Sequence, residues 1–257
     1  MQNFIPISLL GEFLGTLLLV LLGNGVVFSV THNKMMSNQP GKWILIALGW
    51  GLGVFVGALI ALALDSPAHL NPVLSIYNSI SNLDPIFLIY IPFQFLGAIA
   101  GQGILNFINY KHIIATAKKD PNATRGAHFP TAAFDNQKDK ATIFNFSYEF
   151  IGTFVLLLGI FAIGRLNNVV SQTSFPFPVP VTLIIIAIGT SLGGSTGYAI
   201  NPARDLGPRI VYAFSRNYFS KKANNEIALN DWSYSWIPVF APSFAACIMG
   251  GLARIGI

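Results

Sequence analysis

The stretch that decides the fold runs from Gly197 to Arg209 and has the sequence GYAINPARDLGPR. It contains the pair Asn201-Pro202, and a second pair, Asn71-Pro72, lies in the first half of the chain. Asn is a preferred helix N-cap because its side-chain oxygen accepts a backbone N–H. Pro suits the first helical turn, since its missing N–H would be unpaired there. Each pair therefore predicts the start of a helix.

The composition around these pairs is that of a membrane protein. Of the 257 residues, 53% are hydrophobic and only 10% are charged, whereas a soluble domain has about 25% charged residues. A surface with so little charge is unsuited to water. The single cysteine, Cys247, excludes an internal disulfide and any multi-cysteine metal site.

Six stretches are apolar enough to span a bilayer, which takes about 20 residues. They lie near 7–29, 43–64, 86–110, 143–165, 179–197 and 235–255. Two shorter apolar pieces, near 70–79 and 202–214, lie between them, and each carries an Asn-Pro pair at its start. A helix too short to cross leaves irregular backbone at membrane depth, which is tolerated only where it is buried or lines a watery cavity. These two pieces are therefore predicted to be re-entrant half-helices.

The two halves of the chain also match one another elsewhere. The motif EFxGT occurs at Glu12–Thr16 and again at Glu149–Thr153. Each half then has three spans and one half-helix, and an odd number of spans forces the repeats into opposite orientations. Inverted repeats with broken helices are an architecture of transport proteins. We expect a single channel domain over 1–257, with repeats at about 1–110 and 143–257 joined by a loop at 111–142.

The motifs resemble the aquaporin superfamily, the major intrinsic proteins, and within it the glycerol-facilitator branch. The resemblance is strongest at Gly197–Arg209 and at Ala68–Val73, and it covers nearly the whole chain. It implies an all-α membrane protein with six transmembrane helices and two re-entrant half-helices in an inverted, aquaporin-like repeat. The first motif departs from the family pattern, because Val73 stands where Ala is usual. We expect Val73 to alter the contact between the two motifs.

The central motifs have a direct chemical interpretation. Two half-helices that begin at the midplane bring two positive dipole ends together, which disfavours cations and orients water. The Asn side chains use their oxygens as caps, and their NH₂ groups are expected to stay free as donors to a passing oxygen. The predicted central residues are Asn71, Pro72, Val73, Asn201, Pro202 and Ala203.

A narrow filter follows from the resemblance, residue by residue. It implies that Trp50, Gly189, Tyr198 and Arg204 form the constriction. Arg204 would face the hydroxyls of a solute, Trp50 and Tyr198 would form an apolar corner, and Gly189 would leave room where water channels place His. Tyr198 departs from the Phe of the glycerol facilitator, so its hydroxyl bears on the preference for polyol size.

Further roles are also implied by the family. Backbone carbonyls of Pro67, Ala68, His69, Gly197, Tyr198 and Ala199 are expected to line the pore. Glu12 and Glu149 are expected to accept hydrogen bonds from the half-helix loops. Asp205 and Arg209 lie four residues apart, so they can pair on one helix face.

The sequence thus predicts a passive channel for glycerol and other small neutral solutes, with water, that excludes ions and protons. Two alternatives are a water-selective channel and a channel for small neutral acids such as protonated lactic acid. An ion-coupled transporter and a non-conducting junctional protein are the other classes to test. We expect no enzyme activity, cofactor, metal or nucleic-acid partner. The family implies a homotetramer in the lipid bilayer.

The charge distribution conflicts with the topology of the family, which places both termini in the cytoplasm of the cell membrane. Cytoplasmic loops usually carry the excess of Lys and Arg. Here the side opposite the termini carries eleven such residues outside the pore helix, and the side of the termini carries Arg165 and Arg254. The eleven are Lys34, Lys42, Lys111, Lys118, Lys119, Arg125, Lys138, Lys140, Arg216, Lys221 and Lys222. We follow the family orientation, because the resemblance covers the whole architecture.

Overall fold

The computed structural model describes residues 6–120, 122–169 and 178–256, and its regular elements are all helices. Five helical segments are long and apolar enough to cross a membrane, which confirms the predicted class of all-α membrane protein. Their helices are α1 (Pro6–Thr31), α2 (Lys42–Ala63), α4 (Tyr90–Ile108) with the preceding 3₁₀ helix η1 (Pro85–Ile89), α7 (Thr142–Val169), and α11 (Ile237–Arg254) with the preceding α10 (Trp232–Ser235). The sixth apolar helix, α8 (Pro178–Ser191), has 14 residues and ends before the predicted limit of 197.

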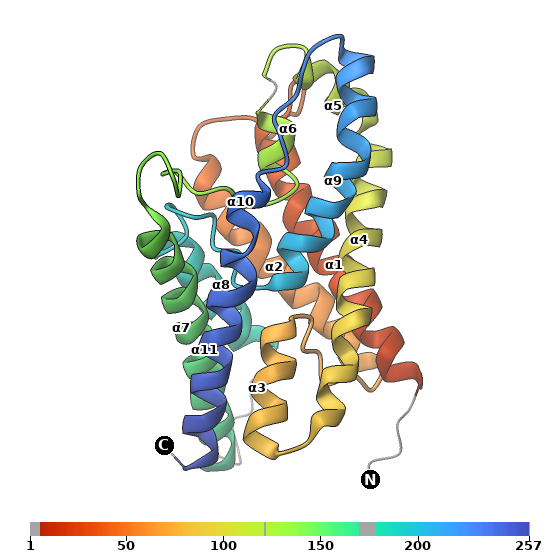
Figure 1. Cartoon of the computed structure of the whole chain (residues 1–257). Coiled ribbons are helices and arrows are strands. Elements are labelled where there is room, and N and C mark those ends of the chain that lie inside the picture. Colours follow the sequence, from red (N-terminus) through yellow and green to blue (C-terminus); the bar gives the residue numbers. More distant parts are fainter. Residues whose placement is uncertain (1–5, 121, 170–177, 257) are drawn as a thin grey trace.

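The two half-helices enter the bundle from opposite ends. Figure 1 shows α3 (Pro72–Asn82) at the end of the bundle that holds both termini, and α9 (Pro202–Ala223) at the other end. The predicted limit of 214 for the second half-helix was wrong, since α9 continues to Ala223. Its last turns, SRNYFSKKA, mix charged and polar residues with aromatic ones, so an apolar run could not predict them. They form a cluster with α5 (Tyr110–Ala117), in which Phe219 packs on Tyr110.

Close backbone contacts hold α1 against its two neighbours. A Cβ added to Gly57 of α2 would lie 2.5 Å from the carbonyl oxygen of Gly15. A Cβ added to Gly101 of α4 would lie 2.5 Å from that of Leu17. No larger side chain fits at either place. Small residues at such contacts let helices approach closely in lipid, where dispersion contacts replace the hydrophobic effect.

The segment predicted as a loop at 111–142 contains α5 and the short α6 (Ala123–Gly126). Asn24 of α1 ties it to the bundle, donating to the carbonyl oxygen of His128 at 2.7 Å and to Gln102 of α4 at 2.6 Å. These helices and the end of α9 lie at the end of the bundle away from the termini (Figure 1). The basic residues of this segment therefore lie opposite the termini.

Candidate pore and its filter

The caps predicted for the two half-helices are present. The Oδ1 atom of Asn71 accepts a hydrogen bond from the backbone N–H of Val73 at 3.0 Å. The Oδ1 atom of Asn201 accepts from Ala203 and Arg204 at 3.0 and 3.1 Å. Both Asn residues have extended backbones, and both are followed by Pro at the first helical position. The chain thus begins each helix at the point that the Asn-Pro pairs predicted.

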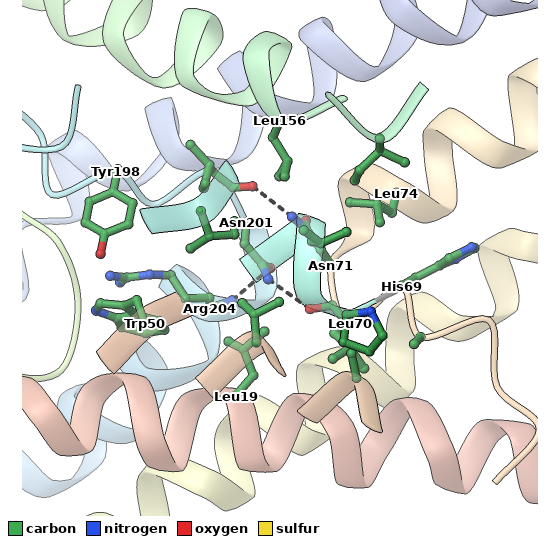
Figure 2. A pocket seen from close by; sticks show the side chains of 18 of the residues that line it. Leu19, Trp50, His69, Leu70, Asn71, Leu74, Leu156, Tyr198, Asn201 and Arg204 are labelled. Atoms are coloured by element: carbon green, nitrogen blue, oxygen red, sulfur yellow. Dashed lines mark hydrogen bonds between the residues drawn. The ribbon is translucent and has the colours of Figure 1, made fainter. Parts of the chain in front are cut away.

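The amide groups of the two Asn side chains link the halves of the chain. Asn71 Nδ2 donates to the carbonyl oxygen of Ile200 at 2.8 Å, and Asn201 Nδ2 donates to that of Leu70 at 2.9 Å (Figure 2). The expectation that the NH₂ groups stay free was therefore wrong in part. An amide nitrogen carries two hydrogens, so these bonds leave one hydrogen of each group for a solute.

The loops that precede the two half-helices have an unusual backbone conformation. Ala68 and Leu70 in one loop, and Tyr198 and Ile200 in the other, have φ between 37° and 53°. This left-handed backbone is unfavourable for residues with a Cβ, by about 1–2 kcal/mol each. Because left-handed residues occur at alternate positions, successive N–H and C=O groups of these loops do not point in the directions that they take in a regular strand. Both loops therefore need partners that fix their N–H groups.

Glu12 and Glu149 are these partners, as the family resemblance implied. Glu12 accepts hydrogen bonds from the backbone N–H groups of His69 and Leu70 at 2.7 and 2.8 Å. Glu149 accepts from those of Ala199 and Ile200 at 3.0 and 2.9 Å. Both acids are fully buried. The two halves thus use the same device at matching positions.

Glu12 has further partners that the sequence did not indicate. Ser66 donates to it at 2.7 Å through its hydroxyl, and Gln94 of α4 donates at 2.8 Å through its amide. Four donors therefore converge on the two oxygens of one side chain, which accept all of them. The one signal in the sequence was that Gln94 is a polar residue within an apolar span, and that alone assigns no partner.

A narrow cavity of about 60 Å³ runs along these loops. Its lining includes the predicted residues Ala68, His69, Tyr198 and Ala199, together with Asn71, Asn201 and Arg204. Apolar side chains from α1, α2, α7 and α8 also line it. They include Leu19, Val54, Leu156, Ile160, Val181 and Ile185. Figure 2 shows Arg204, Trp50 and Tyr198 at one end and His69 toward the other.

Two of the predicted pore carbonyl positions do not border this cavity itself. Pro67 lines a second cavity with Phe87 and Arg165, which shares His69, Leu74 and Ile160 with the first. Gly197 has a φ of 78° and packs on Pro130, where an added Cβ would lie 2.8 Å from the Pro130 Cβ. Of the six predicted positions, Gly197 is thus the one that borders neither cavity.

The ring of His69 is fixed by two hydrogen bonds. Asn78 Nδ2 lies 3.1 Å from His69 Nε2 and also donates to the carbonyl oxygen of Leu74 at 2.9 Å. Because an amide nitrogen only donates, His69 Nε2 is the acceptor. Nδ1 then carries the proton and donates to the Ser75 hydroxyl at 3.0 Å. His69 is held as a neutral imidazole whose two nitrogens are both occupied.

Arg204 lies at the other end of the cavity, against a tryptophan. The guanidinium carbon of Arg204 is 3.9 Å from the centroid of the Trp50 ring. Arg204 is 6% exposed and Trp50 is 3% exposed. An arginine at this depth is expected to face a cavity or a partner, and both side chains line the cavity. Arg204 and Trp50, which the resemblance implied as filter residues, therefore lie against one another at the cavity.

Gly189 lies directly against the ring of Tyr198. A Cβ added to Gly189 would lie 2.8 Å from Cζ and 2.9 Å from the hydroxyl of Tyr198. The absent side chain of Gly189 therefore makes room for the tyrosine ring, and Gly189 is not among the residues that line the cavity. The room that Gly189 was expected to leave is thus occupied by the Tyr198 ring.

The predicted pair of Asp205 and Arg209 is present and fully buried. Arg209 donates to both carboxylate oxygens of Asp205, at 2.7 and 2.9 Å. It also donates to the carbonyl oxygens of Asn230 and Asp231, at 2.7 and 2.9 Å, and lies 3.8 Å from the centroid of the Phe129 ring. A two-pronged pair of this kind gives geometric specificity. With Arg209 held in this way, its bonds to Asn230 and Asp231 fix α9 to the segment that precedes α10.

The fold and the site together define a membrane protein in which two half-helices meet beside an internal cavity. Comparison with known proteins agrees with this class. The family model described as "Major intrinsic protein" matches residues 5–253. The chain belongs to this family.

Relatives and a solved structure are similar over almost the whole chain. A "Probable glycerol uptake facilitator protein" of Mycoplasmoides gallisepticum is 40% identical and covers 96% of both chains. A "Glycerol uptake facilitator protein" of Streptococcus pneumoniae is 43% identical over 94% of this chain and 95% of its own. The X-ray structure of the aquaglyceroporin from Plasmodium falciparum has a TM-score of 0.74 and 30% identity, and covers 96% of this chain and 95% of that one.

Proposed function

We propose that this protein is a passive channel for glycerol and other small neutral solutes, and for water. The observation that carries the proposal is the mixed lining of the cavity. Asn71, Asn201 and Arg204 bring amide and guanidinium groups to it, and aliphatic side chains form much of the rest. Glycerol has hydroxyls along one edge and carbon along the other, so both of its faces find a partner. The names of the related proteins support the same solute.

Ion and proton exclusion forms part of the proposal. The N-termini of α3 and α9 meet at Asn71 and Asn201, where their dipoles favour negative charge and disfavour cations. Arg204 adds a fixed positive charge at the narrow end, with Trp50 against it. A cation would have to pass both features without its hydration shell, whereas a neutral polyol keeps hydrogen bonds throughout.

The proposal extends to the assembly and its place in the cell. We propose one channel domain for the chain, made of repeats at about 1–110 and 143–257, and a homotetramer with one pore in each subunit. The channel lies in the cell membrane with both termini in the cytoplasm. Cysteine labelling at Lys118→Cys in intact cells tests the orientation, because labelling only after permeabilisation would contradict it.

A panel of solutes in proteoliposomes tests the function. Stopped-flow light scattering would compare glycerol, urea, lactic acid at low and neutral pH, and water driven by sucrose. We expect glycerol and water permeabilities well above those of empty liposomes. Water flow without glycerol flow would establish the water-selective alternative. Uptake of lactic acid that exceeds glycerol and rises at low pH would establish the acid alternative.

A further inference from the structure

Trp43, the second residue of α2, lies directly behind the filter, and nothing in the sequence assigned it a role. Its Nε1 atom donates to the carbonyl oxygen of Gly189 at 3.0 Å. Its ring meets that of Tyr198 edge-on, with centroids 6.1 Å apart and an interplanar angle of 73°. Trp43 is not among the residues that line the cavity. It therefore touches two filter residues from outside the pore.

The hydrogen bond satisfies a group that the helix itself leaves open. Gly189 is near the end of α8, which stops at Ser191, and the last four carbonyls of a helix lack partners within it. The indole of Trp43 supplies the partner for Gly189. A tryptophan that only anchors the protein at the membrane interface would not need this contact with a neighbouring helix.

Tyr198 needs such support, since its own hydroxyl does not fix the ring. That hydroxyl is buried and has no hydrogen-bond partner among the described residues. The ring is confined instead by packing. A Cβ added to Gly193 would be 3.0 Å from Cζ2 of Trp43 and would also collide with Cδ1 of Tyr198. Tyr198 thus lies in a slot formed by Gly189, Gly193 and Trp43.

We propose that Trp43 is a positioning residue for the filter. It holds the Tyr198 ring against Gly189 and thereby sets the width of the pore and the largest solute that passes. Without the hydrogen bond, the end of α8 can move away from α2, and the Tyr198 ring gains room to turn out of the pore. This inference rests on the proposed function and adds a determinant of size selection to it.

The test compares Trp43→Phe with the wild type and with Trp232→Phe, a control at an exposed tryptophan of α10. The readout is the ratio of erythritol to glycerol permeability in proteoliposomes. We expect this ratio to rise about fivefold in Trp43→Phe, the factor that one lost hydrogen bond gives in a rate. Trp232→Phe should leave it unchanged. An unchanged ratio in Trp43→Phe overturns the proposal.

A double mutant separates positioning from general loosening. In a Tyr198→Ala background, Trp43→Phe should have no further effect on the ratio, because the ring that it positions is gone. The same rise in both backgrounds overturns the proposal. If Trp43→Phe is not monodisperse in detergent, Trp43→Tyr is measured by the same criteria. A wild type that conducts no glycerol would instead refute the proposed function, so the two failures are distinct.

Discussion

Tyr198 occupies the space that a side chain at residue 189 would need, since a Cβ on Gly189 would lie 2.8 Å from the Tyr198 Cζ. A Cβ closer than about 3.0 Å to another heavy atom cannot be accommodated unless something shifts. Helix α8 packs against Gly51 of α2 through the Ile186 side chain and the carbonyl oxygen of Thr182, so the Tyr198 ring is the part that can move. Under the proposed function, the width of the filter therefore depends on both residues together.

Gly189→Ala should narrow the pore. The added methyl group pushes the Tyr198 ring toward Arg204, and we expect glycerol permeability to fall about tenfold while water permeability falls less. Overpacking of this kind typically costs about 1–3 kcal/mol. Gly194→Ala is the matched control, because nothing lies within 4 Å of a Cβ there. Equal glycerol permeability in Gly189→Ala and Gly194→Ala would refute this arrangement.

Tyr198→Phe should widen the pore. Loss of the hydroxyl leaves part of the space beside Gly189 empty, and the phenyl ring can settle deeper into it. We expect the ratio of erythritol to glycerol permeability to rise about twofold, a change of about 0.4 kcal/mol in relative barriers. Tyr234→Phe is the control, since Tyr234 also has a buried hydroxyl without a partner among the described residues but does not line the cavity. A lower ratio in Tyr198→Phe would contradict the proposed fit.

Glu12→Gln should destabilise the first half-helix loop. The new amide nitrogen replaces one of the two carboxylate oxygens, so it faces two donors in place of an acceptor, either Ser66 and His69 or Leu70 and Gln94. A buried donor without a partner costs about 1–3 kcal/mol, so we expect a clearly lower apparent Tm in detergent and reduced glycerol flux. Glu226→Gln, at a side chain that is 86% exposed, should match the wild type. A Glu12→Gln protein with wild-type Tm and flux would show that the carboxylate is dispensable.

The end of the bundle away from the termini, which holds His32 and His128, should lose stability in acid. Burial lowers the pKa of His128 to about 3 and that of His32, just beyond α1, to about 4, from the usual 6.5. Protons then bind the unfolded chain more readily, so the contribution of these histidines is complete above pH 6.5 and is lost as the pH falls toward 4. Each contributes up to about 1.4 kcal/mol per pH unit.

The apparent Tm between pH 6.5 and 5 checks this, because most carboxylates stay ionised in that window. His128→Phe keeps an aromatic ring between Phe28 and Tyr212 and removes one titrating group. We expect a shallower fall of Tm in the variant than in the wild type. Parallel curves would show that His128 does not titrate on unfolding in this range.

Much of this architecture could be predicted because its signals are local. An Asn-Pro pair specifies its own helix start, and a run of apolar residues specifies a span. The pairing of Asp205 with Arg209 follows from helical spacing alone. The caps at Asn71 and Asn201 were therefore predicted correctly from a few residues each.

What could not be predicted depends on contacts between distant parts of the chain. The bonds from Asn71 to Ile200 and from Asn201 to Leu70 span more than a hundred residues, so no local pattern shows that one amide hydrogen is already used. The same holds for Trp43 and Gly189, which are 146 residues apart. Gly189 could be predicted as small, but only the packing shows that Tyr198 fills its space.

The most direct test of the central claim is the glycerol permeability of wild-type proteoliposomes as a function of glycerol concentration, with no ion gradient present. A passive channel predicts a flux well above that of empty liposomes and nearly linear in concentration. A flux no greater than that of empty liposomes would contradict the account. So would a flux that saturates and appears only when an ion gradient is imposed.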